Sequence, residues 1–187
     1  MSYLEQYDPG PARGAQVRKG GDKWTLILVR ELRHPPEKVW LALTDPAQVR
    51  EWAPFVVDGS LDQVGATVQL TWVGNPTPIP TTVRRAEAPE VLEYGEIRWE
   101  LEALGGGTRL TLWSAIDRRF ISMGAAGWHI AFDVLDHLLS GTPIGRLAGG
   151  EAMKFAAWQR LNAEYAEQFG VKAPNWPANA AKRAERG

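Results

Sequence analysis

The sequence predicts an α+β domain in which a long amphipathic helix covers one face of an antiparallel sheet. In residues 56 to 117, apolar and polar side chains alternate in several consecutive segments, a pattern typical of strands with one buried and one solvated face. Residues 124 to 139 instead repeat apolar residues with a helical period. A sheet with one apolar face needs a cover, and this helix fits that role.

The chain is expected to begin with an irregular arm followed by a buried strand. Residues 1 to 20 contain three glycines, two prolines and little periodicity, so they predict an N-terminal arm without regular structure. Trp24 to Arg33 is dense in apolar and β-branched residues, which indicates a well-buried strand. Pro35-Pro36 ends this strand.

Two short helices are predicted after the first strand. Pro36 suits the first turn of a helix that carries Val39, Trp40 and Leu43 on one face. Asp45-Pro46, a capping residue followed by proline, predicts the start of the second short helix. We expect Trp40 and Trp52 to brace these helices against the long helix.

The alternating segments indicate which side chains of the sheet point inward. Gly105-Gly106-Gly107 predicts a hairpin loop between two of these strands. The inward series are Ala66, Val68, Leu70 and Trp72; Leu92 and Tyr94; Ile97, Trp99 and Leu101; and Leu110, Leu112, Ser114 and Ile116.

The long helix, about Gly124 to Leu139, has three distinct sectors at 100° per residue. The apolar sector comprises Trp128, Ala131, Phe132, Leu135, Leu138 and Leu139, and the polar sector comprises His129, Asp133, Asp136, His137 and Ser140. Ile130 and Val134 form a third sector, which predicts contact with a further element. Glu151 to Phe169 is predicted to be that element, a helix closed by Gly170, and residues 171 to 187 are expected to be a flexible tail.

Composition narrows the function classes. The 187 residues include 44% hydrophobic and 23% charged residues and carry a formal net charge of -1, which predicts a single globular domain rather than a nucleic-acid-binding protein. The chain has no cysteine, so disulfides, thiolate metal sites and a cysteine nucleophile are excluded. No apolar run reaches the length of a membrane span and no signal-like segment stands at the N-terminus, so we expect a cytoplasmic protein.

His129, Asp133 and His137 invite a metal-site hypothesis because two histidines and a carboxylate can bind iron. Residues eight apart on a helix are separated by about 12 Å along the axis, so we expect no metal. For His129 alone, two interpretations stay open: a polar contact or general base at a pocket, or local pairing with Asp133, which the helical geometry favours. The chain has no nucleophile elbow and no phosphate loop, and we expect no cofactor.

Three motifs resemble the START-like (SRPBCC) superfamily and, within it, homologues of the activator of the ninety-kilodalton heat-shock protein ATPase. The first motif is Pro36-x-x-Val39-Trp40-x-Ala42-Leu43-Thr44-Asp45-Pro46 followed by Trp52. The second is Gly107-Thr108-Arg109-Leu110-Thr111-Leu112, and the third is Gly127-Trp128-His129 continuing through Asp133, Leu135 and Leu139 to Gly141. The resemblance covers roughly residues 21 to 170, which we take as the domain.

This resemblance implies a helix-grip fold, in which a curved antiparallel sheet wraps a long C-terminal helix and leaves an apolar cavity between them. Family members bind or transfer hydrophobic molecules, and a minority are cyclases or hydrolases. The eukaryotic activators carry a separate N-terminal chaperone-binding domain. We expect no such domain here, and therefore no direct chaperone contact.

The inward aromatic side chains suit either a packed core or a cavity, and the resemblance favours a cavity. The predicted ligand-binding residues are Trp72, Tyr94, Trp99, Leu112, Ser114, Trp128, Phe132 and Leu135. Tyr94 and Ser114 would be the polar anchors. The predicted function is non-covalent binding of a small lipid, polyketide or aromatic molecule.

Two other functions stay open at this point. One is a cyclase or hydrolase that uses the polar groups of the pocket, such as His129 or Tyr94, as acid and base. The other is a chaperone-associated or homodimeric interaction protein, with the C-terminal helix and its residues Trp158 and Tyr165 as the contact surface.

Overall fold

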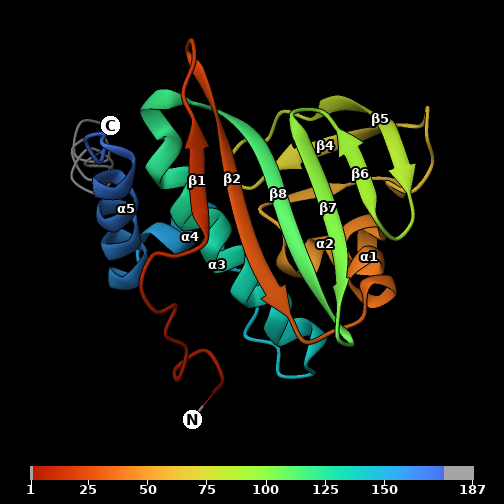
Figure 1. Cartoon of the computed structure of the whole chain (residues 1–187), viewed down its shortest axis with the longest axis horizontal. Coiled ribbons are helices and arrows are strands. Elements are labelled where there is room, and N and C mark those ends of the chain that lie inside the picture. The colour runs from red at the N-terminus through yellow and green to blue at the C-terminus, as the bar shows by residue number, and fades with distance from the viewer. Residues whose placement is uncertain (1, 175–187) are drawn as a thin grey trace.

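Eight antiparallel strands form one curved sheet in the computed structural model, which describes residues 2–174 (Figure 1). The order across the sheet is β1-β2-β8-β7-β6-β5-β4-β3. The strands are β1 (Ala15–Arg18), β2 (Lys23–Leu32), β3 (Phe55–Val57), β4 (Thr67–Trp72), β5 (Ile79–Glu87), β6 (Val91–Tyr94), β7 (Ile97–Leu104) and β8 (Gly107–Asp117). The first strand and the strand series are therefore where the sequence predicts them.

The predicted hairpin loop joins β7 to β8. Leu104 pairs with Gly107 at the end of the ladder, which leaves Gly105 and Gly106 as a two-residue turn. Their φ angles are +50° and +88°, a conformation that glycine adopts without strain. The turn sets the register in which Thr108, Leu110, Leu112 and Ser114 point inward and are buried.

Two short helices, α1 (Pro36–Thr44) and α2 (Pro46–Trp52), brace one end of the sheet. Asp45 caps α2 by accepting a hydrogen bond from the Ala47 amide at 3.3 Å, as the sequence predicts. Trp52 links the two helices because its Nε1 donates to the Ala42 carbonyl at 2.8 Å. Its ring also lies 6.5 Å from the Trp128 ring of the long helix.

The long helix α3 (Ile121–Leu139) lies across the concave face of the sheet, behind β2 and β8 in Figure 1. It begins three residues before the predicted start, directly after the 3-10 turn η1 (Arg118–Phe120). The α+β class and the position of the helix are confirmed.

The C-terminal part of the chain folds as two helices rather than the predicted single helix. They are α4 (Gly149–Met153) and α5 (Ala156–Phe169). The helix breaks at Phe155, whose extended conformation (φ -75°, ψ 130°) caps α5. The break lets α5 lie along α3 while α4 places Met153 beside the sheet. The predicted contact of a further helix with α3 is confirmed.

The N-terminal arm is only partly irregular, because Ala15–Arg18 pairs with β2 as an edge strand. The segment before β1 crosses α3 and α5. There the Tyr7 hydroxyl donates a hydrogen bond to the Asp133 carboxylate at 2.5 Å. The Pro9 carbonyl oxygen accepts a hydrogen bond from His129 Nε2 at 2.7 Å.

Two remaining expectations concern the C-terminus and membranes. The predicted tail lies outside the described residues from position 175 onward. Within residues 2–174, no helix has both the length and the apolar character needed to cross a bilayer.

Candidate functional site

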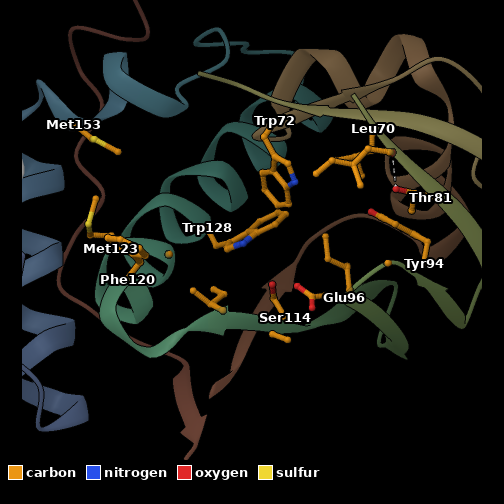
Figure 2. A pocket seen from close by; sticks show the side chains of 16 residues that line it. Leu70, Trp72, Thr81, Tyr94, Glu96, Ser114, Phe120, Met123, Trp128 and Met153 are labelled. Atoms are coloured by element: carbon orange, nitrogen blue, oxygen red, sulfur yellow. Dashed lines mark hydrogen bonds between the residues drawn. The ribbon is translucent and has the colours of Figure 1, made fainter. Parts of the chain in front are cut away.

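A pocket of about 500 Å³ lies between the sheet and the first half of α3 (Figure 2). Strands β4 to β8 supply its sheet side, α3 and η1 supply the helical side, and α4 contributes one residue. The lining residues are Leu70, Trp72, Ile79, Thr81, Tyr94, Gly95, Glu96, Ile97, Ser114, Ala115, Ile116, Phe120, Met123, Gly124, Trp128 and Met153. Most of these side chains are apolar or aromatic, as is usual for small-molecule sites.

Two large apolar side chains at the edge of the pocket are exposed to solvent. Ile79 is 44% exposed and Phe120 is 43% exposed. The remaining rings lie deeper, and Figure 2 shows Trp72, Trp128 and Tyr94 around one common space. The pocket therefore runs from an apolar edge at the surface to an aromatic interior.

Trp128 is the central ring of the site because several other rings hold it. Its centroid lies 6.5 Å from Trp72, 5.6 Å from Trp99 and 6.2 Å from Phe55, all in edge-to-face orientations. Such contacts stabilise aromatic clusters beyond their burial alone. The wall that Trp128 presents to the pocket is consequently well fixed.

Tyr94 supplies a neutral hydroxyl to the interior of the pocket. The hydroxyl oxygen accepts a hydrogen bond from Trp99 Nε1 at 3.0 Å. Burial raises the pKa of Tyr94 well above its ordinary value, so the group keeps its proton at neutral pH.

Charge is confined to the edge of the pocket. Glu96 is the one acidic residue that residues 2–174 contribute to the lining, and its carboxylate pairs with Lys23. Both side chains are more than half exposed, at 55% and 57%. Water therefore screens this ion pair, and its field adds little inside the pocket.

The eight predicted ligand-binding residues separate into two groups. Trp72, Tyr94, Ser114 and Trp128 line the pocket. The structure places Trp99, Leu112, Phe132 and Leu135 in the core instead, where each is fully buried.

The pocket also contains residues that the sequence analysis did not select. Ile116 was among the inward series and Met153 was in the predicted C-terminal helix, so their periodicity was a usable signal. Phe120, Met123 and Gly124 lie where β8 passes into α3, and nothing in the local pattern marks that junction as part of a site.

His129 lies away from the pocket, on the side of α3 that the arm and α5 cover. Its Nδ1 is 2.6 Å from the Tyr165 hydroxyl and its Nε2 bonds Pro9. Asp133 Oδ2 is 3.7 Å from Nε2. Burial lowers the pKa of His129, and both ring nitrogens have protein partners. This environment removes the interpretation as a group at the pocket, and it supports local pairing only in part: Asp133 is a neighbour, but the hydrogen-bond partners, Tyr165 and Pro9, are distant in sequence.

Comparison with known proteins places this architecture in a family. Residues 33–140 match the family described as Activator of Hsp90 ATPase homolog 1-like protein. No curated protein matches the chain.

Several solved structures share the fold. MLL2253 from Mesorhizobium loti is 24% identical with a TM-score of 0.55, covering 64% of this chain and 99% of that protein. CalU16 from Micromonospora echinospora is 23% identical with a TM-score of 0.58, covering 82% and 93%. EF2215 from Enterococcus faecalis, described as a conserved protein of unknown function, is 14% identical with a TM-score of 0.59, covering 82% and 89%. These similarities confirm the helix-grip fold.

Proposed function

The chain belongs to the family of Activator of Hsp90 ATPase homolog 1-like proteins, and from this premise we propose that it binds a small hydrophobic ligand, without covalent chemistry, between the sheet and α3. The observation that carries the proposal is the pocket of about 500 Å³ with its aromatic interior. A surface pocket of this size with a mostly apolar lining and a few polar groups is typical of small-molecule sites.

Apolar burial would supply most of the affinity. Removing apolar surface from water contributes about 25 cal/mol per Å². A ligand that buries about 200 Å² of apolar surface would gain about 5 kcal/mol before the costs of ordering it. The exposed side chains of Ile79 and Phe120 extend the apolar lining to the surface, where such a ligand would enter.

The makeup of the pocket favours binding over acid–base catalysis. A cyclase or hydrolase needs groups that exchange protons near neutral pH. Tyr94 holds its proton too strongly, and His129 is engaged on another side of α3. Glu96 remains, but it is exposed and paired with Lys23. Turnover of a bound ligand by the native protein that is lost in a Glu96→Gln variant would contradict the non-catalytic proposal.

A role as an interaction protein through the C-terminal helix receives less support. Trp158 and Tyr165, which would form the contact surface, are 2% and 0% exposed. Tyr165 is bonded to the arm and to His129. The apolar side of α5 is thus already occupied within the chain.

Native mass spectrometry of the freshly purified protein tests the proposed function. We expect an adduct that disappears on denaturation, and extraction would identify its chemical class. Ser114→Leu would place added bulk in the pocket and should abolish the adduct. Thr111→Leu introduces the same side chain on the opposite face of β8 and should leave the adduct intact. An adduct that survives Ser114→Leu, or the absence of both an adduct and binding of any neutral aromatic probe, would contradict the proposal.

A further inference from the structure

Three side chains that line the pocket, Tyr94, Trp128 and Ser114, carry hydrogen-bond donors that have no protein acceptor in residues 2–174. The Tyr94 oxygen accepts from Trp99, but its own hydroxyl proton has no acceptor within residues 2–174. The Tyr94 side chain is 1% exposed, so water has little access to this hydroxyl from outside the pocket. A buried donor without a partner is unfavourable, and a ligand acceptor in the pocket would relieve that cost.

Trp128 and Ser114 offer two further donors to the same pocket. Both are 4% exposed and both line the pocket, and in the described part of the chain neither the Trp128 indole N–H nor the Ser114 hydroxyl has a hydrogen-bond partner. Thr81 is different, because its hydroxyl already donates to the Ile79 carbonyl at 3.0 Å. Three side chains that line the same pocket thus carry donors without a protein acceptor in the described part of the chain.

No lining residue can neutralise a negative ligand. The lining formed by the described residues contains no Lys, Arg or His, and its one acidic residue is Glu96. A carboxylate ligand would give up its hydration without gaining a cation. The donors are therefore suited to a neutral acceptor, such as a ketone or quinone carbonyl.

The walls favour a flat ligand. The rings of Trp72 and Trp128 meet at 85°, so they form two planes in a corner of the pocket. Aromatic rings stack on such surfaces or meet them edge to face. Resting on the proposed function, we infer that this pocket selects neutral, planar aromatic molecules with a carbonyl oxygen, bound by Tyr94, Trp128 and Ser114, over aromatic carboxylates and plain hydrocarbons.

Three probes of one ring system test this inference by isothermal titration calorimetry. They are 2-acetylnaphthalene, 2-ethylnaphthalene and 2-naphthoate at neutral pH. We expect the ketone to bind about three- to tenfold more tightly than the hydrocarbon, which is the range for one net hydrogen bond. The carboxylate should bind most weakly.

Variants then assign the preference to the donors. Tyr94→Phe and Ser114→Ala should each reduce the advantage of the ketone while leaving affinity for the hydrocarbon unchanged. Trp113→Phe removes an indole N–H from the outer face of the same sheet and should leave all three affinities as they are. Ser114→Ala is the smaller change, so it keeps the test informative if Tyr94→Phe does not fold.

The outcomes separate the two proposals. Equal binding of ketone and hydrocarbon, or tighter binding of the carboxylate, would overturn the inferred selectivity and leave a hydrophobic pocket in place. An advantage of the ketone that survives both variants would overturn the assignment to Tyr94 and Ser114. Failure of all three probes to bind would overturn the inference together with the proposed function.

Discussion

At the scale of single residues, Trp99 and Ser114 share the inward face of the sheet but have different surroundings. Trp99 is fully buried and contacts the rings of Trp52 and Phe132 at 6.0 and 5.9 Å. Trp99→Ala should therefore cost about 3–5 kcal/mol of folding free energy, whereas Ser114→Ala should cost less than about 1 kcal/mol because its hydroxyl has no protein partner in residues 2–174. Urea denaturation measures both. Weaker ligand binding with little loss of stability in Trp99→Ala would instead assign Trp99 to the pocket.

Gly124 controls the width of the pocket where β8 meets α3. A Cβ at this position would lie 2.6 Å from Ile116 Cδ1, so Gly124→Ala must displace the end of the Ile116 side chain. Alanine is also favoured over glycine in a helix by about 1 kcal/mol. We expect Gly124→Ala to weaken binding of a naphthalene probe several-fold with no fall in melting temperature, as measured by calorimetry. A variant that binds as tightly as the native protein would show that Ile116 does not limit the space.

Alternation of apolar and polar residues predicts which side chains face inward, and it did so correctly for all five strand positions among the eight selected site residues. It carries no information on whether an inward side chain meets another residue or an empty volume. Leu112 and Ser114 are successive inward residues of β8, yet only Ser114 lines the pocket. The difference depends on where α3 and η1 pass over the sheet, which is a property of tertiary packing.

At the scale of elements, the N-terminal arm acts as a strap over α3. Tyr7 donates to Asp133, and Arg30 of β2 pairs with the same carboxylate. Tyr7→Phe removes one donor from a largely buried carboxylate, which should cost about 1–3 kcal/mol. Tyr3→Phe is the matched control, because Tyr3 is 51% exposed and has no hydrogen-bond partner for its hydroxyl in the described chain. Equal stability of the two variants in chemical denaturation would mean that the arm is not held by this bond.

His129 should make the stability that the N-terminal arm adds to the protein depend on pH. Burial lowers the pKa of His129, because the charged ring would lose its hydration; Arg30 and Arg13 lower it further, whereas Asp133 and the Pro9 carbonyl raise it and offset part of the shift. The unfolded chain, with an ordinary histidine pKa of about 6.5, then binds more protons than the folded protein as pH falls. The free energy of unfolding should therefore decrease, so that the protein becomes less stable, below about pH 6.5.

The comparison that isolates this effect is His129→Gln, which cannot titrate. His34 and His137 are present in both proteins, so the difference in slope between the two denaturation series belongs to His129. We expect the native protein to lose stability between about pH 6.5 and 5 more steeply than the variant. Parallel slopes would contradict the proposed role of His129.

Helical periodicity correctly placed His129 and Asp133 on a polar side of α3, but it did not predict that this side is buried. His129 is 0% exposed and Asp133 9% exposed, because the arm and α5 cover them. The arm has little periodicity of its own, and its contacts with α3 span more than a hundred residues of sequence. Such long-range pairing of an irregular segment leaves no local pattern, so the strap could not be predicted.

At the scale of the whole molecule, the order of strands and helices along the sequence was enough to predict the fold. One strand, two short helices, a strand series and a long helix suffice to predict a sheet that wraps a helix. The covering of α3 on its other sides by the arm and α5 could be predicted only for α5, through Ile130 and Val134. The pocket therefore lies where the predicted sheet and long helix meet, while Phe120 of η1 and Met153 of α4 complete a lining that the strand and helix pattern did not predict.

Pocket and strap lie on different sides of α3, so their contributions to stability should add. Filling the pocket with 2-acetylnaphthalene at about 100 times its dissociation constant should raise the unfolding free energy by about 2.7 kcal/mol. Ser114→Leu occupies the same space and should remove this response. Tyr7→Phe should lower stability without the ligand yet retain the full increase with it, because contacts with no shared partners are additive to within about 0.5 kcal/mol. Chemical denaturation of the native protein, Ser114→Leu and Tyr7→Phe, each with and without the ketone, measures these free energies of unfolding. A smaller ligand response in Tyr7→Phe would show instead that α3 transmits the loss of the strap to the pocket.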